Sequence, residues 1–215
     1  MDRTQTLAEY IADGAVHVIG IGLGLAATIT LASIVWNSPD FGRQTSVLIY
    51  AGCLMTMLVC SASYNMLAKD YKTSFLRRLD HAAIFLMIGG TYTPLAAMVI
   101  GGWTGSILLA VVWTGALVGA GLKLLASKEL DRITVPICLG LGWIVVFAIQ
   151  PLSENATEFG FWMIVTGGLL YTVGTVFYAW KKLPFQNAIW HVFVLGAAIC
   201  HFAAVLNDVA MFKVA

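Results

Sequence analysis

Seven long apolar runs dominate this chain and limit it to one kind of fold. Each run has about the 20 residues that an α-helix needs to cross the hydrocarbon core of a bilayer. With 60% hydrophobic and only 11% charged residues, the chain lacks the surface of a water-soluble domain, which is roughly a quarter charged. Backbone in lipid must satisfy its own hydrogen bonds, so runs of this length are helices. We therefore predict an all-α fold, a single seven-helix transmembrane domain over 1–215. The expected helices cover about 14–36, 46–67, 80–101, 104–126, 133–151, 159–180 and 187–209.

Basic residues are distributed unevenly over the predicted loops. Seven spans place the N-terminal segment and every second loop on one side, which carries ten Lys or Arg residues against two on the other. Because loops rich in Lys and Arg stay in the cytoplasm, we expect a multi-pass protein of the cell inner membrane with a cytoplasmic N-terminus and an external C-terminus. The net charge of +1 argues against nucleic-acid binding, which normally needs a clustered basic surface. The ten are Arg3, Lys69, Lys72, Arg77, Arg78, Lys123, Lys128, Arg132, Lys181 and Lys182, and the two are Arg43 and Lys213.

Small residues at four-residue spacing predict where helices come close together, because such pairs let helix backbones approach in lipid. The two pairs are Gly20 with Gly24 and Gly115 with Gly119. Pro94 lies inside the third run and predicts a kink there, since proline cannot donate a backbone hydrogen bond.

Polar side chains gather near the predicted cytoplasmic ends of four helices. Three pairs have i, i+4 spacing, which places both members of a pair on one helix face. Ionisable and amide groups inside a membrane are costly and mark functional sites, so we predict a shared polar pocket. The alternative is that each pair makes a hydrogen bond between helices. The expected pocket residues are Ser61, Asn65, Asp80, Asn187 and His191, and further candidates are Glu9, Asp13, His17 and His81.

Two ionisable residues of the last run lie outside this group. His201 is about 15 Å further along the helix axis than His191, so we expect a hydrogen-bonded packing histidine on a different face. Asp208 lies near the outer end of the same run, and we expect its carboxylate to be solvated.

Four segments carry a family resemblance. LDHAAIF (79–85) leads into GTYTP (90–94), and NAIWH (187–191) is followed by CHF (200–202). The stretch from Glu9 to His17 and the segment SASYN (61–65) add to the pattern. With these motifs, nearly the whole chain resembles the hemolysin III family, the bacterial branch of the progestin and adipoQ receptor superfamily. The resemblance implies a seven-helix bundle with its N-terminus inside the cell.

The resemblance also implies a metal site that this chain has altered. The family holds zinc with three histidines, one on the second helix and two on the seventh, beside an aspartate of the third. Those positions are Asn65, Asn187 and His191 here, with Asp80 as the aspartate and Ser61 as its neighbour. An amide oxygen is a weak zinc donor, so too few good ligands remain. We therefore expect no metal or other cofactor, and zinc only if the family site is retained.

Three functions fit these observations. The first is a metal-free regulator, sensor or lipid-responsive binding module whose partners are membrane lipids. The second, implied by the resemblance, is a zinc-dependent amidohydrolase acting on ceramide-like lipids, with Asp80 as general base for a metal-activated water. Asn65 and Asn187 favour the first over the second. The third is a transporter or proton-coupled protein, which ranks last because no inverted repeat or pair of broken helices is visible in the sequence.

Overall fold

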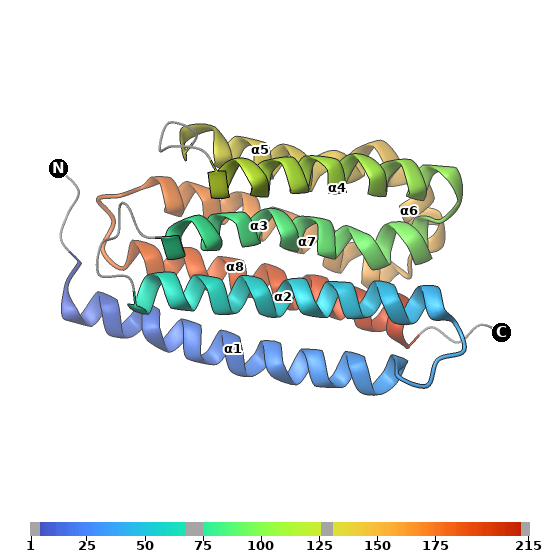
Figure 1. The fold of residues 1–215 in the computed structure, drawn as a ribbon, viewed down its shortest axis with the longest axis horizontal. Coiled ribbons are helices and arrows are strands. Elements are labelled where there is room, and N and C mark those ends of the chain that lie inside the picture. The colour runs from blue at the N-terminus through green and yellow to red at the C-terminus, as the bar shows by residue number, and fades with distance from the viewer. Residues whose placement is uncertain (1–4, 68–74, 126–130, 212–215) are drawn as a thin grey trace.

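The computed structural model describes residues 5–67, 75–125 and 131–211, and all of its regular elements there are helical (Figure 1). Within these residues, seven helices are long and apolar enough to cross a membrane. They lie along one long axis, with the start of α1 and the end of η4 at opposite ends (Figure 1). The predicted all-α fold with seven spanning helices is confirmed. The elements are α1 (Leu7–Val35), α2 (Phe41–Leu67), α3 (Phe75–Pro94), η1 (Leu95–Ile100), α4 (Gly102–Leu125), α5 (Asp131–Trp143), η3 (Ile144–Ala148), α6 (Ile149–Asn155), α7 (Glu158–Ala179), α8 (Gln186–Val205) and η4 (Leu206–Ala210).

Helices α1 and α2 begin before their apolar runs do. α1 starts at Leu7 rather than near 14, because Thr6 and Glu9 form a capping box. In it, Glu9 N donates to Thr6 Oγ1 at 3.3 Å and Thr6 N donates to Glu9 Oε2 at 2.8 Å. α2 starts at Phe41 rather than near 46, and a backbone N–H of its first turn donates to Asp40 Oδ1 at 3.0 Å. Capping side chains therefore extend both helices beyond the segments that hydropathy detects.

The fifth span is not the continuous helix expected over 133–151. It consists of α5, the 3₁₀ segment η3 and the short helix α6. Tyr92 of α3 reaches the junction, where its hydroxyl donates to Gly142 O at 2.7 Å and accepts from Val145 N at 2.9 Å. This side chain supplies hydrogen bonds to backbone groups at the point where the regular helix stops.

The regular α-helix of the third span stops at Pro94, the residue at which a kink is predicted. α3 ends at Pro94, and the chain continues as the π-helical segment η1. The Thr91 hydroxyl donates to Met87 O at 2.9 Å and the Thr93 hydroxyl donates to Gly89 O at 2.8 Å. These bonds reinforce the last turns of α3, next to the carbonyl that loses its helical donor at the proline.

Helix α3 lies in the middle of the bundle, and glycines let its neighbours approach closely (Figure 1). The third span is the most enclosed, since 67% of its apolar window is buried against 39% or less for the others. A Cβ atom on Gly119 of α4 would lie 2.4 Å from the Phe85 ring of α3, and one on Gly115 would lie 2.5 Å from Leu141 of α5. On α1, a Cβ atom on Gly24 would lie 2.3 Å from the nearest side-chain atom of α2. The predicted close helix contacts are present at Gly24, Gly115 and Gly119, whereas a Cβ atom on Gly20 would meet Leu58 at an ordinary contact distance of 3.5 Å.

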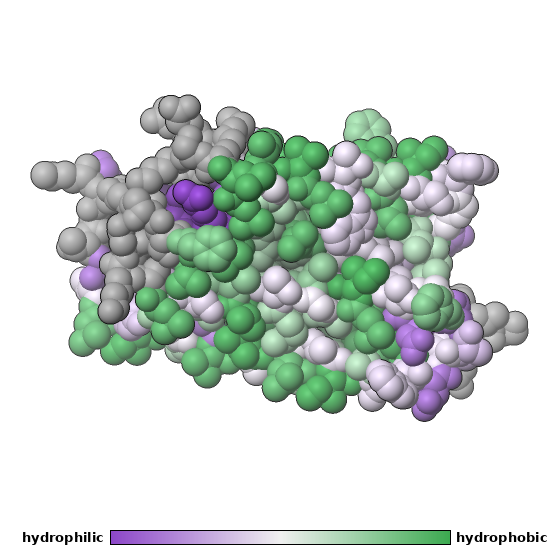
Figure 2. Space-filling model, in the orientation of Figure 1, coloured by the Kyte–Doolittle hydropathy of each residue, from purple (hydrophilic) through white to green (hydrophobic). Residues whose placement is uncertain are grey.

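The outer surface shows the pattern of a membrane-spanning bundle. Figure 2 shows hydrophobic residues across the middle of one face and hydrophilic residues toward the two ends. The side chains of Val18, Leu117 and Phe147 are exposed although they are apolar. Exposed apolar side chains around the middle of the bundle are favourable when membrane lipid covers them.

The end of the bundle at which α1, α3 and α8 begin is called the N-terminal end below. Arg77, Arg78, Lys123, Arg132, Lys181 and Lys182 lie at or near helix termini on this end, and Arg43 lies at the other. Arg3, Lys69, Lys72, Lys128 and Lys213 lie outside the described residues. The direction in which the bundle crosses a membrane stays a prediction.

Candidate functional site

Three ionisable side chains meet between α1 and α8 at the N-terminal end, and they are called the Asp13–His17–His191 cluster below. Asp13 and His17 are one turn apart on α1 and share a face, while His191 comes from the second turn of α8. Asp13 is fully buried, His17 is 7% exposed and the His191 side chain is 11% exposed. Asp13 Oδ1 lies 2.5 Å from His191 Nδ1 and 3.8 Å from His17 Nε2. The two imidazole rings are 4.4 Å apart between centroids.

The cluster contains two buried polar atoms that have no hydrogen-bond partner among the described residues. They are Asp13 Oδ2 and His17 Nε2. Buried polar atoms in folded proteins nearly always have a partner, and each exception calls for an explanation such as water, an ion or a ligand. The cluster is therefore incomplete as a purely structural hydrogen-bond network.

Asp80 and Ser61 lie beside this cluster. Asp80, in the second turn of α3, is 9% exposed. Its carboxylate accepts a hydrogen bond from the Ser61 side chain of α2, and it interacts electrostatically with His191 and Asp13. The structure thus brings together ionisable and hydroxyl groups from four helices.

The two asparagines at the family's ligand positions are placed differently. Asn65 is buried on α2, and its Nδ2 donates to Ser61 O at 2.9 Å, so the amide nitrogen turns back along its own helix. Asn187 is half-buried in the first turn of α8 and is not among the described residues that line the neighbouring cavity. Of the three ligand positions, only His191 belongs to the cluster.

The last two candidates have separate roles. Glu9 Oε1 accepts a hydrogen bond of 2.8 Å from Phe185 N, which ties the start of α1 to the start of α8. Phe185 has a left-handed backbone with φ of 58°, so this bond also helps to hold an unfavourable conformation. His81 lies edge-on to Tyr64, with ring centroids 6.5 Å apart, and lines the cavity together with Asp80.

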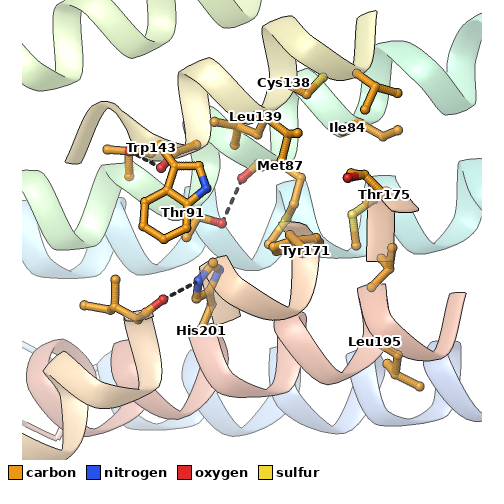
Figure 3. A pocket seen from close by; sticks show the side chains of 18 of the residues that line it. Ile84, Met87, Thr91, Cys138, Leu139, Trp143, Tyr171, Thr175, Leu195 and His201 are labelled. Atoms are coloured by element: carbon orange, nitrogen blue, oxygen red, sulfur yellow. Dashed lines mark hydrogen bonds between the residues drawn. The ribbon is translucent and has the colours of Figure 1, made fainter. Parts of the chain in front are cut away.

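A cavity of about 240 Å³ is lined at one end by several of these polar groups and continues between the helices. Its walls come from all the spanning helices except α4. Ile84, Met87 and Leu139 belong to its largely apolar wall (Figure 3). The polar lining at the N-terminal end includes His17, Ser61, Asp80, His81 and His191.

His201 lines the deeper part of the same cavity, which the sequence reasoning missed (Figure 3). Its Nε2 lies 3.4 Å from Ile164 O, and its ring centroid lies 5.7 Å from that of Tyr171. A Cβ atom on Gly167 would lie 2.4 Å from the imidazole, so a glycine makes room for it. His201 makes the expected hydrogen bond, but its depth does not separate it from the polar pocket, because the cavity runs along the helix axis. No sequence signal distinguishes a histidine that only packs between helices from one that also lines the cavity.

Asp208 is 6% exposed, so the expectation of a solvated carboxylate was wrong. Its Oδ2 accepts from Thr157 N at 3.1 Å and its Oδ1 accepts from Thr157 Oγ1 at 2.7 Å. Asn207 Nδ2 also donates to Asp208 Oδ1, at 2.6 Å. Thr157 is the N-cap of α7, and negative charge is favourable at a helix N-terminus. The Asp208 carboxylate, near the end of the seventh span, therefore caps the N-terminus of the neighbouring helix α7.

Comparison with known sequences places the chain in a family. The family described as "Haemolysin-III related" matches residues 7–202. The chain belongs to this family. This haemolysin III protein is 35% identical over 206 residues to Hemolysin-3 of Bacillus cereus. The matched residues make up 94% of this chain and 93% of that protein. It is 34% identical over 201 residues to the Hemolysin-3 homolog of Bacillus subtilis (strain 168), with 94% of each chain covered.

A more distant relative connects the haemolysin III protein with the progestin and adipoQ receptor superfamily. The monocyte to macrophage differentiation factor of Homo sapiens is 26% identical over 176 residues, covering 78% of this chain and 72% of that protein. No solved structure matches the chain.

The zinc that the family resemblance implies does not fit the residues at the family's ligand positions. Asn65 directs its amide nitrogen to Ser61 O, and Asn187 is not among the described residues that line the cavity. His191 is the one good zinc donor of the three, and its Nδ1 pairs with Asp13. No step of the function is therefore assigned to zinc bound at these three positions.

Proposed function

We propose that this haemolysin III protein is a lipid-responsive binding module, a regulator or sensor whose cavity accepts the acyl chain of a membrane lipid. The cavity carries the proposal, because it combines a long apolar wall with polar groups at one end. Ligand sites typically have this composition, with a few polar groups that orient an otherwise apolar molecule. An amphipathic lipid matches it, with the chain along the wall and the polar group beside Ser61 and Asp80.

The size of the cavity supports this proposal. An apolar cavity of roughly 150 Å³ already stays dry and takes up small apolar molecules, and this cavity measures about 240 Å³. At its polar end, the Ser61 hydroxyl and the Asp80 carboxylate offer hydrogen bonds to hydroxyl or amide groups. Occupancy would change the packing among α3, α5, α7 and α8, which is how a bound lipid would alter the shape of the protein. This binding needs no metal at the family's ligand positions.

Two glycines of α5 provide a matched test of the proposal. Gly142 lines the cavity, Gly140 does not, and neither has an atom within 4 Å of a Cβ built on it. We expect Gly142→Leu to lower the amount of lipid that co-purifies with the protein several-fold, because the new side chain takes up cavity volume. Gly140→Leu adds the same side chain outside the cavity and should leave that amount unchanged. Mass spectrometry of lipid extracted from equal amounts of detergent-purified protein measures the difference.

Equal lipid content in the wild type and Gly142→Leu would contradict the proposal, provided that both elute as folded protein in size-exclusion chromatography. A loss shared by Gly142→Leu and Gly140→Leu would also contradict it, because the effect would then not come from the cavity.

A further inference from the structure

We propose that Asp13, His17 and His191 bind a divalent transition-metal ion between α1 and α8, with Zn²⁺ as the expected ion. Two of these residues lie on the first helix, and only His191 belongs to the positions at which the family resemblance implies zinc. The proposal replaces the expectation of a metal-free protein, which considered Asn65, Asn187 and His191 with Asp80 beside them and left out Asp13 and His17. It is independent of the proposed lipid binding.

The donor set suits the ion. Each residue offers one ligand atom, and these three atoms all lie within 4.8 Å of one another. In a tetrahedral zinc site with metal–ligand distances near 2.1 Å, neighbouring donor atoms are roughly 3.4 Å apart. His17 Nε2 and Asp13 Oδ1 are already 3.8 Å apart. Small side-chain rotations would bring the three donors to ligand distances. Two imidazoles and one carboxylate are also a known three-ligand set for zinc.

The two buried atoms without hydrogen-bond partners also support a bound metal ion. If the cluster only joined α1 to α8, the hydrogen bond between Asp13 and His191 would be sufficient. That bond leaves Asp13 Oδ2 and His17 Nε2 buried without a partner among the described residues. Both are electron-pair donors when the carboxylate is ionised and the imidazole carries its proton on Nδ1. A cation satisfies both atoms at once, whereas the hydrogen bond between helices satisfies neither.

Burial and charge favour a cation at this point. Asp13 is 0% exposed, and burying a carboxylate is costly unless it is paired or binds a metal. A second buried carboxylate, Asp80, lies close enough to interact electrostatically with both Asp13 and His191. A divalent ion would offset the negative charge that these two aspartates bring to the N-terminal end.

The position relative to the cavity leaves room for a further ligand. His17 and His191 line the cavity, whereas Asp13 does not. An ion held by the three side chains would therefore sit at the cavity wall, with protein ligands on one side and open space on the other. Sites with three protein ligands and an open position are typical of metals that contact a small molecule.

Two histidines of the cavity wall allow a matched test, because His17 belongs to the cluster and His81 does not. Purified full-length protein is washed with a chelator, loaded with Zn²⁺, desalted and analysed for metal by mass spectrometry. We expect close to one zinc per chain for the wild type and for His81→Gln. We expect at least a tenfold lower zinc content per chain for His17→Gln and for Asp13→Asn, because each removes one of three donors.

Three results would overturn the proposal. They are a wild type that stays empty after loading, a His17→Gln variant that keeps the wild-type zinc content, and a His81→Gln variant that loses zinc to the same extent as His17→Gln.

A measurement on the wild type alone keeps the proposal testable if the cluster variants do not fold. X-ray absorption at the zinc edge of the loaded protein should show two imidazole ligands and oxygen in the first shell. A first shell with one imidazole or none would exclude the site.

Discussion

At the scale of single residues, two buried aspartates near opposite ends of the bundle have contrasting environments. Asp208 accepts hydrogen bonds on both oxygens from Thr157 and Asn207. Asp13 has one oxygen paired with His191 and the other without a partner among the described residues. When both oxygens of a buried carboxylate accept hydrogen bonds, a role in holding the fold together is enough to explain its burial. Asp13 is 0% exposed and keeps one oxygen without a partner among the described residues, which is why Asp13 rather than Asp208 enters the proposed site.

The structural role of Asp208 leads to a stability prediction. Replacing Asp208 by Ala removes the acceptor of Thr157 N and Oγ1 at the N-terminus of α7. Because a carboxylate at a helix N-terminus contributes about 0.3–1 kcal/mol, and up to about 2 kcal/mol where it is partly buried, we expect the free energy of unfolding to fall by about 0.3–2 kcal/mol. Thermal unfolding of the detergent-purified protein measures it. Glu154→Ala, at an exposed position of α6, serves as the control and should leave the midpoint nearly unchanged. Equal midpoints for the two variants would contradict the capping role.

At the scale of elements, similar apolar runs become helices of different regularity. The fifth span is divided at η3, and the Tyr92 hydroxyl binds Gly142 O and Val145 N at that division. Tyr92 is about 50 residues earlier in the chain, so the local pattern of the fifth run contains no sign of the contact. Pro94 is the opposite case, because its effect on the backbone is local and can be predicted from its own position.

The contact between α3 and α4 gives a prediction at the same scale. A Cβ atom on Gly119 would lie 2.4 Å from the buried Phe85 ring, whereas one on Gly121, two residues further along α4, meets nothing within 4 Å. We expect Gly119→Ala to lower the free energy of unfolding by about 1–3 kcal/mol, the usual cost of overpacking a buried contact. Gly121→Ala should leave stability unchanged or raise it slightly, because alanine favours a helix over glycine. The midpoint of thermal unfolding is measured for both variants. A Gly119→Ala midpoint equal to that of the wild type would argue against tight packing at this contact.

At the scale of the whole molecule, the distribution of basic residues predicts how the bundle crosses the membrane. Ten Lys or Arg residues are assigned to the side of the N-terminus and two to the side of the C-terminus. The positive-inside rule therefore predicts a cytoplasmic N-terminus and an external C-terminus. A C-terminal fusion to a reporter enzyme that is active only outside the cytoplasm should be active, and a fusion after the second span should be inactive. The reverse activities would contradict the predicted orientation.

The sequence by itself determined the helical class, the seven spans and the grouping of polar side chains near one end. Hydropathy sets span number, and the helical repeat places residues such as Asp13 and His17 on one face, because both are local properties of the chain. Only the tertiary structure decided which faces meet. It paired Asp13 with His191 of α8, turned Asn65 back toward Ser61, and extended the cavity as far as His201. These outcomes depend on how helices far apart in the sequence rotate and pack against one another, and a single helix carries no information about the rotation of its neighbours.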